Sequence, residues 1–190
     1  IKLRGAGMNV NEKTCLRFAK SIKELAAVKP LDKITVREIT DNCGLTRQTF
    51  YRHFIDKYDL VNWYFEKLAK NTVRQMGVSM TLIDGLTQKY TLILKDIVFF
   101  RAAFQSSSCN SLFEYDMDLI YKMYEAVITR KTGKSLEPDI AFLLEMYCRG
   151  SMEMTVEFVC GKLKADPAGM ARLLVEAMPE RLKGLLSELN

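Results

Sequence analysis

The chain has few of the residues that build metal centres and covalent active sites. Among its 190 residues there is one histidine, His53, and none of the five cysteines is paired at Cys-x-x-Cys spacing. The usual zinc sites need clusters of such ligands. The sequence also lacks a glycine-rich phosphate loop and any spacing that pairs a nucleophile with a base. We therefore expect no bound metal, no cofactor and no catalytic residue.

Long apolar segments are missing as well. No apolar run reaches the roughly 18 residues that a membrane-spanning helix needs, and no continuous apolar signal segment lies near the start. An odd number of scattered cysteines is typical of reduced thiols in a cytoplasm. We expect a cytoplasmic protein with no membrane partner, in which residues 1–7 form a basic arm.

The alternating pattern of β-strands is absent, and apolar residues instead recur every three to four positions, as in helices. The sequence predicts an all-α fold of about nine helices, two of them short and discussed below. Pro179 is expected to kink or split the last helix. The other seven helices are expected at about 11–28, 56–76, 80–96, 97–106, 111–131, 137–163 and 166–189.

The segment from Ile34 to Leu60 carries the most specific pattern in the chain. Thr35 followed three residues later by Glu38 is a capping box at the start of a short helix. Gly44 ends that helix, because glycine adopts a left-handed backbone at little cost. Thr46 is a natural N-cap for a second short helix. Two short helices joined by a glycine turn predict a helix-turn-helix.

The second short helix is expected at residues 47–54, with Phe50 and Phe54 on its inner side. Its outer side carries Arg, Gln, Thr and Tyr, which donate hydrogen bonds and offer flat surfaces. Arg can pair with guanine and Gln with adenine, each discriminating by about 1–3 kcal/mol. The residues expected to contact DNA are Thr35, Arg37, Thr46, Arg47, Gln48, Thr49, Tyr51, Arg52, His53 and Lys57.

A third helix follows at once, capped by Asp56. Lys57 lies in its first turn, where the lysine and the N-terminal N–H groups of the helix can share one phosphate. His53 is explained better by a phosphate contact than by catalysis.

Positive charge is concentrated in the same part of the chain. Residues 1–70 hold 14 Lys and Arg against 8 Asp and Glu, an excess of +6, whereas residues 71–190 hold 14 against 15. Attraction to phosphates is the expected use of this asymmetry. The alternative is a solvated, lysine-rich helix face, and for Lys13, Lys20 and Lys23 on the first helix that alternative is favoured.

The helix-turn-helix features occur at a joint spacing that can be compared with known families. They are Thr35, Gly44-Leu45, Thr49-Phe50-Tyr51, Phe54, Lys57 and Leu60. This pattern resembles the DNA-binding domain of the TetR family of bacterial regulators. The resemblance implies a helix-turn-helix domain at residues 1–57 and a helical ligand-binding and dimerisation domain at 58–190. Cys43 stands where the family commonly has alanine, and Arg47-Gln48 replaces a frequent Lys-Gly or Pro, a change expected to set which operator is read.

The second half resembles one branch of that family more loosely. Tyr147, Gly150, Phe158 and Gly161, followed by Pro167, are similar to a branch that includes regulators related to dihydroxyacetone kinase operons. Phe158 stands where a tryptophan is common.

The last two helices each carry a wide apolar face, and a single chain buries one such face more easily than two. Paired with a second copy, they would form a four-helix bundle, as the resemblance also implies. We expect a homodimer that reads a palindrome with two recognition helices about 34–36 Å apart. The alternative is that both faces form the core of one chain. The apolar residues are Ile140, Leu143, Leu144, Tyr147 and Cys148, then Met170, Leu173, Leu174, Ala177, Met178, Leu182 and Leu185.

The resemblance also implies a pocket for an unidentified small-molecule effector. The middle of the chain is rich in methionine and aromatic residues, which adapt to apolar ligands, although residues at helical spacing are equally those of a plain core. The candidate pocket residues are Trp63, Phe100, Phe104, Phe113, Met117, Tyr121, Met146 and Tyr147.

Two functions from different classes follow. The first is a dimeric transcription regulator that binds double-stranded DNA and responds to an effector. The alternative is a small helical ligand carrier or enzyme without DNA binding, for which the sequence offers no site chemistry. An adaptor protein that uses helix surfaces alone would not need the basic excess at one end.

Overall fold

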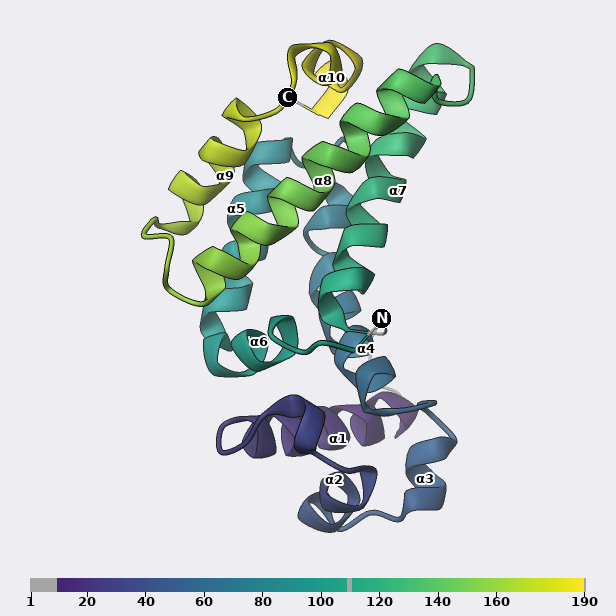
Figure 1. Ribbon diagram of the computed structural model, residues 1–190. Coiled ribbons are helices and arrows are strands. Elements are labelled where there is room, and N and C mark those ends of the chain that lie inside the picture. The colour runs from purple at the N-terminus through teal and green to yellow at the C-terminus, as the bar shows by residue number, and fades with distance from the viewer. Residues whose placement is uncertain (1–9, 109–110, 190) are drawn as a thin grey trace, which may run out of the picture.

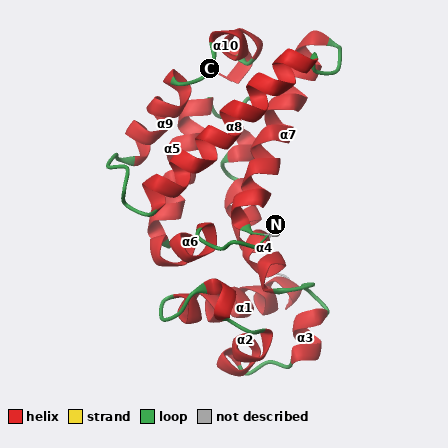
Figure 2. Ribbon diagram, in the orientation of Figure 1, coloured by secondary structure: helices red, strands yellow, loops and turns green. Residues whose placement is uncertain are grey.

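Helices make up the framework of the protein, and the computed structural model describes residues 10–108 and 111–189. A small body of α1, α2 and α3 lies below a larger one, and α4 rises from the first into the second (Figure 1). The described residues form helices and loops without a β-strand (Figure 2), which confirms the all-α prediction. The basic arm expected at residues 1–7 lies outside the described residues. The α-helices are α1 (Val10–Ala26), α2 (Val36–Cys43), α3 (Arg47–Tyr51), α4 (Lys57–Ala69), α5 (Leu82–Lys95), α6 (Ile97–Phe104), α7 (Leu112–Thr132), α8 (Pro138–Val159), α9 (Pro167–Glu176) and α10 (Glu180–Leu185).

Helix α4 ends earlier than the sequence predicts. The helix expected at 56–76 stops at Ala69, and residues 70–72 form turns. A 3₁₀ turn, η2 (Val73–Gln75), follows. The last helix is split into α9 and α10 at Pro179, as the sequence predicts, because proline cannot continue a helix.

The small body is held together by aromatic side chains from three helices. Phe18 of α1 meets Phe50 of α3 edge to face, with ring centroids 5.2 Å apart, and Phe54 lies 6.3 Å from Phe18. Ile39 of α2 is fully buried beside them. Phe50 and Phe54 thus point inward as their four-residue spacing predicts, although α3 itself ends at Tyr51 and Phe54 follows in a turn.

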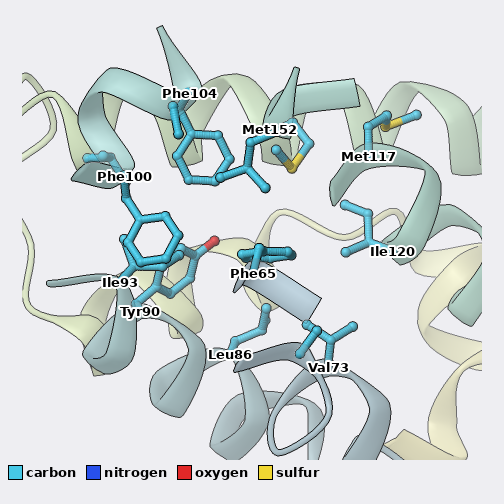
Figure 3. Packing of buried hydrophobic residues seen from close by; sticks show 14 of the residues in the cluster. Phe65, Val73, Leu86, Tyr90, Ile93, Phe100, Phe104, Met117, Ile120 and Met152 are labelled. Atoms are coloured by element: carbon cyan, nitrogen blue, oxygen red, sulfur yellow. The ribbon is translucent and has the colours of Figure 1, made fainter. Parts of the chain in front are cut away.

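The larger body surrounds the upper part of α4. Phe65 lies among side chains of α5, α6 and α7 (Figure 3), and its ring meets those of Phe100 and Tyr115 at 6.3 Å. In this body α5 packs against α9 and α7 against α8. Because α4 is buried at both of its ends, it is the element through which the two bodies can influence each other.

Two polar clusters also join the bodies. The carboxylate of Asp96, between α5 and α6, forms an ion pair with the Lys23 ammonium at 2.6 Å and accepts a hydrogen bond from the Tyr64 hydroxyl at 2.6 Å. The carboxylate of Asp32, in the 3₁₀ turn η1 (Leu31–Lys33), accepts hydrogen bonds from the hydroxyls of Ser106 at 2.5 Å and Tyr58 at 3.0 Å. These bonds fix the small body against the loops that flank α6.

Candidate nucleic-acid interface

The helix-turn-helix is built by the local signals that the sequence carries. The Thr35 hydroxyl accepts from the Glu38 N–H at 3.2 Å, and the Glu38 carboxylate accepts from the Thr35 N–H at 2.9 Å, which completes the capping box. Gly44 has φ of +64°, the left-handed conformation that ends α2. Thr46 caps α3 by accepting from the Thr49 N–H at 3.1 Å. The turn between α2 and α3 is therefore fixed on both sides.

Bonds from α1 hold α2 in place, and sequence reasoning did not find them. The buried hydroxyl of Ser21 donates to the Ile39 carbonyl at 2.7 Å. The Arg17 guanidinium donates to the Cys43 carbonyl at 2.7 Å, which places a cation on the C-terminal end of α2. These bonds join residues 18 and 26 positions apart, so no short motif signals them.

The outer face of α3 is polar and open. Arg47, Gln48 and Arg52 are exposed, and Tyr51 is 52% exposed while its ring edge packs on Phe50. The side chains that the sequence places outside are thus free of the core and project from one short helix. Contact with DNA stays a prediction for each of them.

The remaining candidates surround this face. Thr35, Arg37 and Thr46 are exposed, whereas Thr49 and His53 are half-buried. Arg37 lies near Asp41 on its own helix, at 3.5 Å between Nε and Oδ2, a surface pair that a phosphate could readily replace.

Lys57 is placed differently from the sequence expectation. Its ammonium donates to the backbone carbonyls of Asp32 at 2.7 Å and Ile34 at 2.8 Å, and burial lowers its pKa. One of its three N–H donors remains for a phosphate. Two of the N–H groups expected beside it, those of Tyr58 and Asp59, are already taken by the Asp56 carboxylate at 2.8 Å each. Lys57 therefore ties α4 to the small body, which its position in the sequence did not reveal.

The eight residues proposed for an effector pocket differ in burial and come from several helices. Phe100, Phe104 and Met117 lie in the buried core (Figure 3), where the two phenylalanine rings are 6.4 Å apart. Tyr147 is buried and donates to the Leu174 carbonyl at 2.8 Å. Met146 is 59% exposed on the outer side of α8.

The other three candidates are half-buried, and they come from two different helices. Trp63 on α4 packs against Phe54 at 5.7 Å, beside the small body, while Phe113 and Tyr121 belong to α7. Which of the eight side chains touch a ligand stays a prediction.

A second exposed surface lies on α8, which crosses the larger body between α7 and α9 (Figure 1). Phe142, Met146 and Met154 are 64%, 59% and 44% exposed, and they share one face of the helix with Gly150. Leu173 on α9 adds a 49% exposed side chain. We call these five residues the α8 stripe.

Burial within this chain removes part of the two faces expected to meet a partner. Several of the apolar residues proposed for dimer contact instead form the core of this chain, because α7, α5 and α10 pack against the inner sides of α8 and α9. The residues that turn out to be buried are Ile140, Leu144, Tyr147, Cys148, Met170, Leu174, Met178 and Leu182.

Neither a metal site nor a membrane span is found in residues 10–108 and 111–189. Their His, Cys, Asp and Glu side chains form no group of three that could hold an ion. No helix among them has the length and apolar character needed to cross a membrane.

Comparison with known proteins gives matches in both halves of the chain. Residues 20–63 match the family described as bacterial regulatory proteins, tetR family, and residues 80–180 match a transcriptional regulator C-terminal region. A solved structure described as the dihydroxyacetone kinase operon activator DhaS is similar in fold, with a TM-score of 0.56 at 16% identity. The match covers 93% of this chain and 96% of that chain.

Proposed function

Because the chain belongs to the TetR family of bacterial regulatory proteins, and is thus a DNA-binding transcriptional regulator rather than an enzyme, we propose that it acts as a homodimer on a palindromic operator under the control of a small-molecule effector. The observation that carries the proposal is the outer face of α3, from which polar side chains project. Gly44 ends α2 and Thr46 caps α3, so the turn between them holds α3 in place. The alternative of a carrier or enzyme without DNA binding loses its support with the family assignment.

In this proposal α3 enters the major groove and reads bases from its first turn. Arg47 and Gln48 carry the side chains that pair with guanine and adenine edges. Tyr51 and Arg52 lie one turn later, and Thr35, Arg37 and Thr46 approach the phosphates at either side. Arg47 and Gln48 therefore determine the sequence that is read, while the flanking groups set the register of the protein on the duplex.

The second copy covers the α8 stripe. Phe142, Met146 and Met154 are exposed along one face of α8. At Gly150, on the same face, a Cβ atom would meet no other atom within 4 Å, so the backbone is open to close approach there. Exposed apolar faces of this kind mark interfaces. A two-fold axis through the stripe would make a four-helix bundle of α8 and α9 from both chains and hold the two α3 helices about one DNA turn apart.

Effector control acts through α4 in this proposal. A ligand in the larger body would move α4 and change the separation of the two recognition helices, which couples the sites by about 1–3 kcal/mol. The bonds of Asp96 with Lys23 and of Asp32 with Ser106 supply a second path, because they join the small body to the ends of α6.

The experiment is fluorescence anisotropy with a duplex from the upstream DNA of the gene itself, chosen for an inverted repeat. We expect tight binding that weakens with salt, and loss of preference for the repeat over scrambled DNA in Arg47→Ala. Lys33→Gln is the control, because it removes one positive charge, as Arg47→Ala does, at an exposed position outside α3. This variant should keep the preference for the repeat. Equal binding of repeat and scrambled DNA by the unmodified protein would contradict the operator proposal.

A further inference from the structure

A groove of about 490 Å³ runs along the outer face of α7, where that helix lies beside η2 and the turn at Gly77. This volume is in the range of small-molecule sites. Its floor is apolar: Val73, Met76 and Val127 are buried, and Leu119 and Met123 are half-buried. The residues proposed for an effector from the sequence take no part in it.

The charges along the groove are mostly positive. Among the described residues that line it, Arg74, Lys122 and Arg130 stand beside one carboxylate, that of Asp118, which accepts from Lys122 at 2.7 Å. The Arg74 guanidinium, half exposed, lies 2.6 Å from the carboxylate of Glu66 on α4. An apolar floor below a cationic rim complements a molecule with an apolar body and an anionic head.

We propose that this groove binds a small amphipathic anion, such as an aliphatic or aromatic carboxylate, whose head group competes with Glu66 for Arg74. The regulatory part of the inference rests on the proposed function, because it makes the groove a site that acts on DNA binding through α4. The binding part stands by itself.

The contacts of Glu66 connect the groove with α4. One oxygen of its carboxylate accepts from Arg74, and the other accepts from the Tyr115 hydroxyl at 2.7 Å. The neighbouring Phe65 is buried in the core that η2 reaches through Val73 (Figure 3). A ligand carboxylate that draws Arg74 away leaves Glu66 with one bond fewer, and the upper end of α4 loses a link to η2.

Charge selects the occupant among the candidates for an apolar groove. A cationic amphiphile would meet Arg74, Lys122 and Arg130 at the rim, against the one described lining carboxylate of Asp118. A neutral amphiphile would leave Arg74 with its present partner. A second copy of the chain would cover the groove only if it presented acidic side chains there, and its binding would depend on protein concentration. An amphipathic anion is the occupant that satisfies both the floor and the rim.

The test uses decanoate, below its micelle concentration, with the full chain. Binding is measured by calorimetry and by the fluorescence of Trp63, the only tryptophan, which lies on α4 one turn before Glu66. Decanol and decyltrimethylammonium are the matched neutral and cationic probes. We expect saturable binding of one decanoate per chain and weaker binding of both control probes.

Three variants locate the site. Ala126→Trp, at an exposed lining position, should fill the groove and abolish decanoate binding with the fold intact by circular dichroism. Lys122→Gln combined with Arg130→Gln should weaken decanoate binding about tenfold and leave decanol binding unchanged. Lys164→Gln, an exposed lysine outside the groove, should change neither.

The binding and regulatory parts are tested separately. Equal affinity for decanoate and decanol, or unaltered decanoate binding by Ala126→Trp, would overturn the assignment of the groove. Decanoate should shift the affinity for the operator duplex, and Arg74→Gln should shift it in the same direction and abolish the response. If decanoate binds but leaves operator affinity unchanged, the link to α4 is wrong while the DNA-binding proposal stands. If no duplex binds, the proposed function fails and the binding result is unaffected.

Discussion

Lys89 of α5 and Asp116 of α7 form an ion pair in the interior of the larger body, with 2.6 Å between Nζ and Oδ2 and side chains 3% and 0% exposed. The ammonium also lies over the rings of Phe65, at 5.6 Å, and Tyr90, at 5.9 Å. Burial raises the pKa of Asp116 even though Lys89 lies beside it. The second carboxylate oxygen has no hydrogen-bond partner among the described residues. The pair therefore joins α5, α7 and α4 at a considerable cost of desolvation.

Removing one member of this pair should destabilise the protein more than removing both. Lys89→Met leaves an uncompensated buried carboxyl group and should lower the free energy of unfolding by about 3–5 kcal/mol. Lys89→Met with Asp116→Leu should recover most of that loss, because two apolar side chains need no partner. Urea unfolding at one fixed protein concentration measures the cycle. A double variant as unstable as the sum of the single variants would show that the two residues act independently.

The α8 stripe should control the oligomeric state. Met146→Glu places a charge in the centre of the proposed two-fold contact, where a second copy brings the same charge opposite. We expect light scattering after size exclusion to give the mass of one chain, with helicity retained and operator affinity reduced at least tenfold. Ile83→Glu, a like change at an exposed apolar residue of α5, should remain dimeric. A dimeric Met146→Glu would place the interface elsewhere.

Lys57 should affect both stability and DNA binding. Lys57→Met removes the bonds to the Asp32 and Ile34 carbonyls and should lower the free energy of unfolding by about 1–3 kcal/mol. If its third N–H meets a phosphate, the slope of log affinity against log salt should also flatten by about one. Thermal unfolding and salt titration separate the two effects. An unchanged slope with lost stability would leave Lys57 a purely structural role.

Acid should loosen the contact between the two bodies. Burial alone would raise the pKa of Asp96, but the hydrogen bonds from Lys23 and Tyr64 hold it below its usual 3.8. A pKa that is lower in the folded chain stabilises the fold above the usual value, and this stabilisation is lost as the pH falls through the lowered one. Asp96→Asn should therefore reduce stability at pH 6 and flatten its decline below pH 4, as measured by denaturant unfolding at each pH.

A surface carboxylate supplies the comparison for that experiment. Asp41 is exposed and paired with Arg37 at 3.5 Å, so Asp41→Asn should change the free energy of unfolding at pH 6 by less than about 1 kcal/mol. The pKa of Glu38 is lowered in the folded chain, as that of Asp96 is, because its bonds with Lys29 and Thr35 bring it to about 2. Acid should therefore weaken the contribution of Glu38 to stability in the same direction. A profile of Asp96→Asn that matches the unmodified protein would contradict the role given to the Lys23 contact.

The sequence predicts the helix-turn-helix well because its signals are local. Thr35, Glu38, Gly44 and Thr46 act on backbone groups within three residues of themselves, so their spacing is sufficient to place both helices. Periodicity likewise indicates which side of α3 is polar. The bonds of Lys57 reach carbonyls 23 and 25 residues away, and no short pattern could reveal them.

The second half is harder to predict, since apolar residues surround its helices on more than one side. On α8 the periodic pattern is satisfied equally by Tyr147, which lies in the core, and by Met146, which lies outside. A count of apolar positions does not say which face meets the chain's own helices. The early end of α4 is equally hidden, because residues 70–76 contain neither glycine nor proline to mark it.

That early end makes α4 a short strut between the two bodies. Its 13 residues extend about 20 Å, about 10 Å less than a helix that continued to residue 76. Tilting a rod of that length by about 10° displaces its far end by roughly 3 Å, close to the rise of one base pair. A modest reorientation of α4 in each subunit is therefore enough to move the two α3 helices out of register with successive major grooves.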